Sequence, residues 1–344
     1  MKHMNTIIMM LVLTTTVSAH HSDAGLDVDS ILAFEGTVTE FGFRNPHVYV
    51  DMETMQSGEP VIWSLQMGTA NGLRRRGWTN ETLVPGDRVF VRVHPALDGR
   101  PYAVVESIQK QGGLILAGGV TLQDASNDPE VSPESDSIAG IWRVDATKLV
   151  AYPGGFDGFF HANLKLTEQG AAAQSSYDPL SAENPESTCL GRPTPGAIVS
   201  TTFYLLEIQI EENLDSPIII RSEYFDEERI IHMDGREHPP ATERLSTGHS
   251  IGRWEEDTLV VDTTNFTDHR SPYQIGVPSG IRKHVIERYR LISNGTRMIV
   301  EFTLDDPDYI AEPMTHQREL IYSPQEQFFS FNCDLNASGR FVRP

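Results

Sequence analysis

Residues 285–304 read VIERYRLISNGTRMIVEFTL. Asn294-Gly295 predicts a tight hairpin turn, because both residues accept positive φ angles, and β-branched and aromatic residues on each side favour strands. We therefore expect Val285–Ile292 to pair with Arg297–Leu304. Further turns are predicted at Asp234-Gly235, Glu255-Glu256-Asp257 and Asn213–Ser216. Serial hairpins of this kind predict an antiparallel β-barrel or meander over residues 138–344.

The tripeptide Gly140-Ile141-Trp142 opens this C-terminal region. It is similar to the Gly-X-Trp motif that begins the first strand of lipocalins, in which the tryptophan closes one end of the barrel. The resemblance implies a lipocalin-like barrel. A barrel of that kind can enclose a small apolar ligand.

The N-terminal half also shows a strand pattern, between Leu32 and Lys110. Five short runs alternate in polarity and are separated by turns such as Pro85-Gly86-Asp87, and one short helix is expected around Thr69–Arg76. Five strands and one helix predict a small OB-like barrel over residues 20–112, with an open sandwich as the competing arrangement. Residues 113–137 are acidic and rich in Pro and Ser, which predicts a flexible linker. The predicted fold class is therefore all-β.

The first 19 residues have the pattern of a cleaved secretory signal. A basic start precedes the apolar run Ile7–Leu13, and the small residues Val17-Ser18-Ala19 follow. Cleavage after Ala19 predicts a periplasmic or secreted protein. No later stretch approaches the ~20 apolar residues that span a bilayer, so we expect no transmembrane segment.

Charge and cysteine content narrow the expected partners further. The chain of 344 residues has a formal net charge of -21 at pH 7, whereas nucleic-acid binding needs clustered Lys and Arg, so we expect no nucleic-acid partner. Cys189 and Cys333 are its two cysteines. In an oxidising compartment we expect them to form a disulfide, and two separate buried thiols are the alternative. The oligomeric state is not predicted.

A first candidate site consists of His20, His21 and His47. If cleavage follows Ala19, the α-amine and the imidazole of His20 form a chelating pair, and a second imidazole completes a three-nitrogen arrangement that suits copper. This start resembles the histidine brace of periplasmic copper-resistance proteins and of lytic polysaccharide monooxygenases. His47 is the expected second ligand, with His21 and His94 as rivals. The alternative is that these adjacent histidines are simply solvated.

Several short motifs follow one another over residues 20–110. They are His20-His21-Ser22, Gly36–Phe41, Asn45-Pro46-His47-Val48, Arg75-Arg76-Gly77-Trp78 and Leu83–Asp87. Together they resemble a family of exported bacterial proteins that is known only as a domain of unknown function. The resemblance implies an exported small β-domain and no established activity.

A second candidate site lies in the C-terminal region. The runs IHMDGREHP (residues 231–239) and GHSIGRWEEDTLVVDT (residues 248–263) also resemble an uncharacterised exported family, from which no activity transfers. His249, His284 and Glu287 are the candidate acid–base residues, since a histidine with a carboxylate partner can move protons. We expect His249, Arg253 and Glu287 to line a barrel mouth. The candidate ligand-binding residues are His232, His238, Arg253 and Trp254. The alternative is that these side chains are structural, with Trp254 in a core.

These observations favour a binding protein outside the cytoplasm. The first domain would handle copper, and the second would bind a small hydrophobic ligand. The residues leave open whether the protein is an enzyme. The enzyme alternatives are a copper oxidase or monooxygenase, and a hydratase, isomerase or lyase that acts on a hydrophobic substrate in the second barrel. A structural module of the cell envelope is the third alternative.

Overall fold

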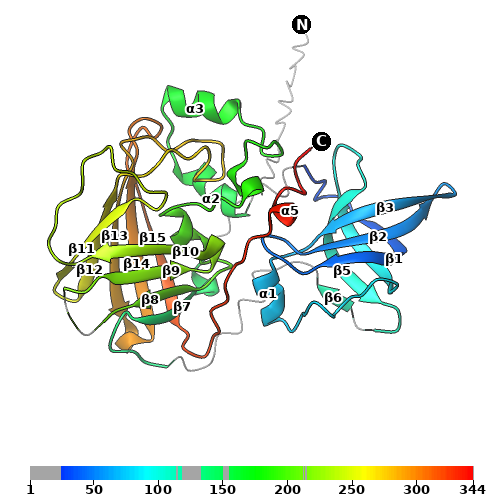
Figure 1. The fold of residues 1–344 in the computed structure, drawn as a ribbon, viewed down its shortest axis with the longest axis horizontal. Helices are drawn as coiled ribbons and strands as arrows, with labels where there is room; N and C mark the ends of the chain where they lie inside the picture. The colour runs from blue at the N-terminus through cyan, green and yellow to red at the C-terminus, as the bar shows by residue number, and fades with distance from the viewer. Residues whose placement is uncertain are drawn as a thin grey trace, which may run out of the picture.

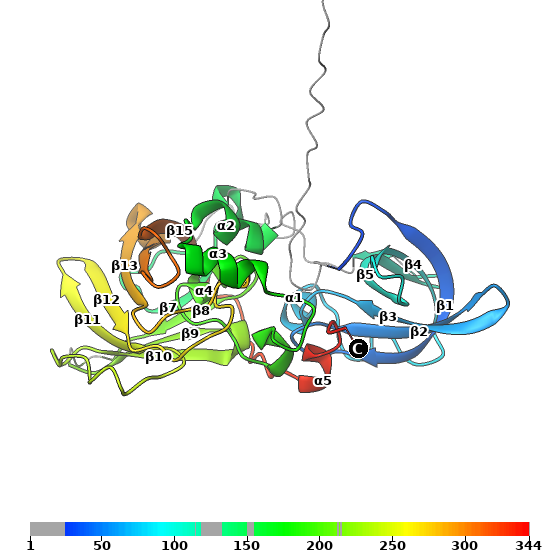
Figure 2. The same ribbon diagram turned by 90° about the horizontal axis from the view of Figure 1, so that it is seen from above.

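The computed structural model describes residues 25–113, 115–117, 133–149, 155–211, 213 and 215–343. The predicted signal, His20, His21 and most of the predicted linker lie outside this part of the chain. Two β-barrels lie side by side in Figures 1 and 2, which confirms the predicted all-β fold class with a smaller barrel before a larger one. Among the described residues, no helix combines the length and the apolarity needed to cross a membrane.

The first barrel has the OB-like topology that the sequence predicts. Strands β1 to β4 are paired in the order β3-β2-β1-β4, β5 follows β4, and a parallel pairing of β3 with β5 closes the barrel. Strand β6 extends this sheet beyond the predicted domain boundary at residue 112. The elements are β1 (Leu32–Gly42), β2 (Tyr49–Gln56), β3 (Glu59–Gln66), α1 (Ala70–Arg75), β4 (Arg88–Pro95), β5 (Tyr102–Lys110) and β6 (Ile115–Ala117).

Helix α1 lies between β3 and β4, where a helix is expected. Thr69 caps it, because its hydroxyl accepts a hydrogen bond of 3.0 Å from the backbone N–H of Gly72. Leu73 is fully buried in the core of this barrel, together with Val50 and Leu65. The helix therefore presents Leu73 to the barrel and the exposed Arg74 to solvent.

The second barrel is closed by nine strands in the order β10-β11-β12-β13-β14-β15-β7-β8-β9. Its N-terminal strand β7 pairs with the last strand β15, which joins the two ends of the domain. The strands are β7 (Gly140–Val144), β8 (Leu206–Gln209), β9 (Ile218–Ser222), β10 (Glu227–His232), β11 (His249–Glu255), β12 (Thr258–Thr264), β13 (His284–Ile292), β14 (Arg297–Asp305) and β15 (Met314–Tyr322).

Short helices join and flank these strands, and most of them precede β8. The α-helices are α2 (Gly155–Asn163), α3 (Glu168–Ser175), α4 (Gly196–Ser200) and, near the C-terminus, α5 (Leu335–Ser338). The 3-10 helices are η2 (Ala146–Lys148), η3 (Pro185–Thr188), η4 (Tyr224–Asp226) and η5 (Ser293–Gly295). Figure 1 shows α2 and α3 at one end of the second barrel.

The structure confirms two of the predicted turns and contradicts one. The Asn294-Gly295 turn joins β13 to β14, and Glu255-Glu256-Asp257 joins β11 to β12, as antiparallel hairpins. The predicted hairpin at Asp234-Gly235 was wrong. Strands β10 and β11 pair in parallel, with Ile231 opposite Ser250, and a parallel pair requires a crossover rather than a tight turn. Residues 233–248 form that crossover.

The interior of the second barrel holds large side chains and the buried ion pair of Arg229 with Glu287. Trp142 is fully buried, donates a hydrogen bond of 2.8 Å from Nε1 to the carbonyl oxygen of Ile138, and lies 5.1 Å from the ring of Tyr322. Arg229 and Glu287 form an ion pair of 2.8 Å inside the barrel. Thr194 donates a hydrogen bond to the same Glu287 carboxylate. These contacts leave both buried charges paired, as low-polarity surroundings require.

The segment after β15 returns to the first barrel and ties the two barrels together (Figure 2). The predicted disulfide between Cys189 and Cys333 is present and anchors this segment. The Asn45 amide of the Asn-Pro-His motif donates a hydrogen bond of 2.6 Å to the carbonyl oxygen of Phe331 and accepts one of 2.8 Å from the N–H of Ala70. Asn45 is therefore a junction between α1 and the C-terminal segment, beyond the turn-forming role that the sequence indicates.

Candidate functional site

Four histidines and one aspartate gather on the outer face of the second barrel. Side chains alternate between the two faces of a strand, so Val261 and Thr263 are buried in the barrel while Asp262 faces outward. On the neighbouring strands the same alternation turns His249 and His284 outward. His232 ends β10, next to β11, and His238 belongs to the crossover 233–248. We call His232, His238, His249, Asp262 and His284 the histidine cluster.

Asp262 is at the centre of the hydrogen-bonded part of this cluster. Its Oδ1 lies 3.2 Å from Nε2 of His238 and 2.9 Å from Nε2 of His284. The side chains of His238, Asp262 and His284 are 22%, 26% and 39% exposed, so solutes reach the site from solvent. One carboxylate oxygen is thus shared by two imidazoles from different parts of the chain.

A second contact extends the cluster from His238 to His249 and His232. Nδ1 of His238 lies 2.9 Å from Nδ1 of His249. The ring of His232 stacks on the ring of His249 with 5.0 Å between their centroids. Asp262, His238 and His249 therefore form a continuous chain, and His232 packs against its end.

The contacts determine where the protons lie when the imidazoles are neutral. A neutral imidazole donates from one nitrogen and accepts at the other. The carboxylate of Asp262 accepts from Nε2–H of both His238 and His284, so Nδ1 of His238 must accept from Nδ1–H of His249. That leaves Nε2 of His249 as a bare nitrogen, for which no hydrogen-bond partner is found in the described part of the chain.

The surroundings shift the pKa values of these groups in opposite directions. The hydrogen bond to Asp262 raises the pKa of His284. Burial lowers the pKa of His249, and the neighbouring imidazoles of His232 and His238 lower it further. Burial favours protonation of Asp262, but the hydrogen bonds from the two histidines outweigh it and lower its pKa. The pKa of His284 therefore lies above the ordinary histidine value, whereas the pKa values of His249 and Asp262 lie below their ordinary values.

Among the described residues, no group of three or more His, Cys, Asp or Glu side chains is arranged so that it could hold a metal ion. In the histidine cluster, ring nitrogens that a metal ion would need are held in hydrogen bonds. His238 uses both ring nitrogens for hydrogen bonds, one toward Asp262 and one toward His249. A metal ion would have to replace a proton there.

The structure separates the other predicted residues from this cluster. Glu287 lies inside the barrel, because it is three positions after His284 on the same strand and so faces the opposite side. Arg253 is exposed and forms an ion pair of 2.6 Å with Glu255. Trp254 is 39% exposed and is not a core residue. The expected convergence of His249, Arg253 and Glu287 at a barrel mouth is therefore not found.

The histidines of the first barrel occupy different surroundings. Nδ1 of His47 lies 3.3 Å from the carbonyl oxygen of Met67, and Nδ1 of His94 lies 2.9 Å from that of Ser30. Because His20 and His21 lie outside the described residues, the predicted brace stays a prediction.

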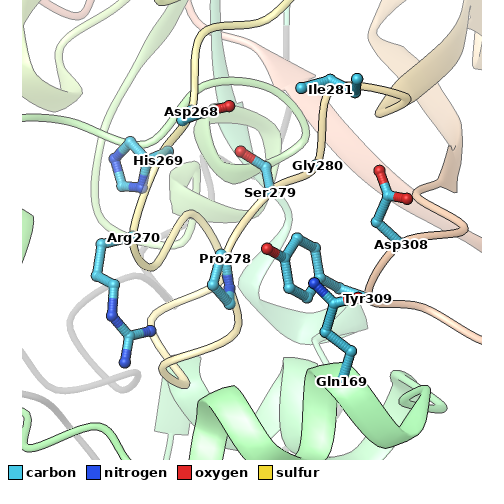
Figure 3. A pocket seen from close by; sticks show the side chains of 10 residues that line it. All are labelled: Gln169, Asp268, His269, Arg270, Pro278, Ser279, Gly280, Ile281, Asp308 and Tyr309. Carbon is cyan, nitrogen blue, oxygen red and sulfur yellow. The ribbon is translucent and has the colours of Figure 1, made fainter.

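An open cavity of about 490 Å³ lies elsewhere on the second barrel and is lined in part by Gln169, His269, Ser279 and Tyr309 (Figure 3). His269 is fixed in it, since Nε2 donates to the carbonyl oxygen of Gly191 at 2.9 Å and Nδ1 accepts from the N–H of Ser271 at 3.1 Å. Burial lowers the pKa of His269 to about 4. Both nitrogens are committed, so we assign His269 a structural role.

Asp262 is the member of the histidine cluster that the sequence interpretation missed. It lies in the run TLVVDT (residues 258–263), in which the sequence pattern alone assigns no role to the aspartate. The register of the β11–β12 hairpin could have identified Asp262 from the sequence. With Glu255-Glu256-Asp257 as the turn, alternation places Asp262 on the same face as His249.

The comparison with protein families concerns the first barrel. Residues 9–104 match the model of a family described as a family of unknown function (DUF6152). No curated protein matches the sequence. The matched region ends before the second barrel, so the histidine cluster lies in a part of the chain that this family model does not cover.

Proposed function

We propose that the protein binds a divalent transition-metal ion through His238, His284 and Asp262, outside the cytoplasm. The observation that carries the proposal is the single oxygen of Asp262 shared by the Nε2 atoms of two histidines. Two histidines and one carboxylate form a ligand set that first-row metals use with further positions open. The signal-like N-terminus and the disulfide support export.

Two of the three donor spacings lie in the range that such an ion requires. Metal–ligand bonds of about 2.0–2.1 Å place neighbouring ligand atoms roughly 2.9 Å apart in an octahedron and roughly 3.4 Å apart in a tetrahedron. The two contacts of Asp262, at 2.9 and 3.2 Å, lie within this interval. His238 and His284 would still have to move around Asp262 before the three side chains could hold an ion, because they form no such group as they stand.

Metal binding would reverse the direction of the hydrogen bond between His238 and His249. With an ion held by Nε2 of His238 and Nε2 of His284, His238 would carry its proton on Nδ1 and would donate it in a hydrogen bond to Nδ1 of His249. A ligating histidine is commonly held in this way by an acceptor for its other nitrogen. His249 is thus a supporting residue in the proposed site.

The other predicted functions have less support. Copper binding at His20 and His47 rests on the sequence pattern alone. Carriage of a small apolar molecule in the second barrel competes with the interior side chains, among them Trp142, Tyr289 and Phe302, which are fully buried there. One observation favours an enzyme as the second candidate. The bare Nε2 of His249, oriented through His238 by Asp262, has the arrangement of a general base.

The test is a titration of the exported full-length protein with Zn²⁺, Ni²⁺ and Cu²⁺, by native mass spectrometry and calorimetry. We expect one tight equivalent whose affinity falls at least about 100-fold in His238→Ala, because a ligand is lost. His249→Phe should cost about 10-fold to 100-fold, as supporting residues do. Arg253→Gln is the matched control, since its side chain is 60% exposed and outside the cluster.

Two outcomes would decide against this site. Unchanged affinity in both His238→Ala and His284→Ala would exclude the cluster. Loss of binding only when a residue is added before His20 would assign the metal to the predicted brace instead. If no metal binds, the acid–base interpretation of His249 becomes the leading one.

A further inference from the structure

The open cavity of about 490 Å³ in Figure 3 is built from three segments of the second domain. Helix α3 contributes Gln169, the loop between β12 and β13 contributes residues 268–270 and 278–281, and the loop between β14 and β15 contributes Asp308 and Tyr309. These lining residues are distinct from the histidine cluster. The volume is within the range of cavities that hold a small molecule.

Backbone hydrogen bonds hold the three segments against one another. The N–H of Ser279 donates to the carbonyl oxygen of His269 at 3.0 Å, which joins the two arms of the β12–β13 loop. The N–H of Thr167, the residue that caps α3, donates to the carbonyl oxygen of Tyr309 at 3.0 Å. The cavity walls are therefore fixed before a ligand arrives, and a preformed site lowers the entropic cost of binding.

The hydroxyl group of Ser279 is the feature that points to a ligand. Ser279 is 3% exposed, and no hydrogen-bond partner for its Oγ is found in the described part of the chain. A buried hydroxyl group without a partner destabilises a protein, so such a group calls for an explanation. Because Ser279 belongs to the cavity lining, a polar ligand there would supply the missing hydrogen bond.

Asp308 presents an acceptor close to this hydroxyl group. Arg282 holds Oδ1 of Asp308 through two hydrogen bonds of 2.6 and 3.1 Å. The other oxygen, Oδ2, lies so near the α-carbon of Gly280 that a Cβ built there would overlap it. Gly280 directly follows Ser279, so a hydroxyl group and a carboxylate oxygen lie at the same wall of the cavity (Figure 3).

The charges around the cavity balance one another. Asp268 and Asp308 line it together with Arg270, and Arg282 pairs with Asp308 at 2.6 Å. The guanidinium of Arg270 is held in place by hydrogen bonds of 2.6 and 3.3 Å to two backbone carbonyl oxygens. Two carboxylates therefore face two guanidinium groups, and the site as a whole favours an uncharged ligand.

The remaining lining suits a molecule that carries several hydroxyl groups. Gln169 has an amide group and Tyr309 a phenol hydroxyl group, and both groups can donate and accept hydrogen bonds. The hydroxyl groups of a ligand have the same dual capacity. Pro278 and the ring of Tyr309 add apolar surface, against which the carbon atoms of a ligand can pack.

We infer that this cavity binds an uncharged polyhydroxylated molecule of the size of one sugar ring. Ser279 and Asp308 recognise its hydroxyl groups, and the ring of Tyr309 packs against its carbon skeleton. The inference is independent of the proposed metal site, since none of these three side chains is a proposed metal ligand.

The test measures the binding of monosaccharides to the full-length protein by saturation-transfer difference NMR. The probes are the methyl glycosides of glucose, galactose, mannose and N-acetylglucosamine. The matched compound is 2-methoxytetrahydropyran, which has a similar ring without free hydroxyl groups. We expect saturable binding of at least one glycoside and none of the matched compound. The inference is wrong if none of the four glycosides binds saturably, or if the matched compound binds equally well.

Ser279→Ala is the deciding variant. The hydroxyl group has no partner in the described part of the chain, so its removal should leave the melting temperature unchanged. Glycoside affinity should fall about three- to tenfold, as the loss of one hydrogen bond predicts. Asp308→Ala should weaken binding at least as much, because a hydrogen bond to a charged group is lost. Ser107→Ala, on β5 of the first barrel, is the matched control and should bind like the wild type. Unchanged affinity in both cavity variants would overturn the inference.

Discussion

Individual residues show how the second barrel tolerates polar groups inside. Glu287 is fully buried, and Arg229 supplies two hydrogen bonds to its carboxylate at 2.8 and 3.0 Å. The side chain of His316 lies in different surroundings. Its ring lies 4.5 Å from the ring of Phe159 and 5.8 Å from that of Phe302, and no partner for its Nε2 is found in the described part of the chain. The ion pair with Arg229 compensates the charge of Glu287, whereas the aromatic surroundings of His316 keep its imidazole neutral.

His316 should make the protein sensitive to acid. Burial, with a smaller contribution from Arg318, lowers its pKa from 6.5 to about 4. Between these values the unfolded chain takes up a proton that the folded chain refuses, so this residue costs stability as the pH falls. We expect the free energy of unfolding of His316→Phe, relative to that of the wild type, to be about 1–2 kcal/mol higher at pH 5 than at pH 8. Urea unfolding at both pH values measures this, and an equal gain at both would contradict it.

At the scale of elements, the turns decide which strands become neighbours. Gly295 ends the β13–β14 turn with a φ of +79°, and a Cβ there would lie 1.7 Å from the carbonyl oxygen of Ser135. The N–H of Ser135 donates to the carbonyl oxygen of Gly295 at 3.2 Å. The turn therefore both reverses the chain and receives the segment that enters the second barrel.

Gly295→Ala should lower the free energy of unfolding by more than the left-handed backbone conformation alone explains. Gly235 is the matched control, since its φ is +74° and nothing lies within 4 Å of its Cβ position. We expect Gly235→Ala to lower the free energy of unfolding by about 1 kcal/mol, and Gly295→Ala to lower it by about 3 kcal/mol because Ser135 must also move. Denaturant unfolding checks both. Equal losses would show that the contact with Ser135 is unimportant.

At the scale of the whole molecule, the C-terminal segment joins the two barrels. Arg340 forms an ion pair with Asp51 of the first barrel, and Asn45 pairs with Cys333 through a parallel β-bridge. Cys333 is bonded to Cys189 of the second domain. One short segment thus contacts both barrels and carries the covalent link.

Removal of the disulfide should destabilise the protein substantially. Its half-cystines are separated by 144 positions, so the bond restricts a long loop of the unfolded chain. Loss of that restriction is expected to cost about 2–5 kcal/mol. We expect the double variant Cys189→Ala/Cys333→Ala to melt several degrees below the oxidised wild type in calorimetry. The wild type with reduced thiols is the control, and it should melt near the variant. Coincident melting of variant and oxidised protein would contradict this.

The sequence by itself determined the local features of the fold. The alternation of side chains, the turns at Asn294-Gly295 and Glu255–Asp257, and the two-barrel division follow from residues that are close in the chain. The pairing of Cys189 with Cys333 was the expected one, because two cysteines allow one intramolecular bond, and the structure shows this bond rather than two separate thiols. These features depend on short-range conformational preference and composition.

The tertiary structure alone decided the parallel pairing of β10 with β11, and with it the position of His238 over Asp262. It also decided that Glu287 faces the interior while His284 faces outward. Each of these depends on the register and closure of strands whose partners are far away in sequence. A shift of one residue in a strand would turn its side chains to the opposite face, so local sequence is insufficient to assemble the histidine cluster.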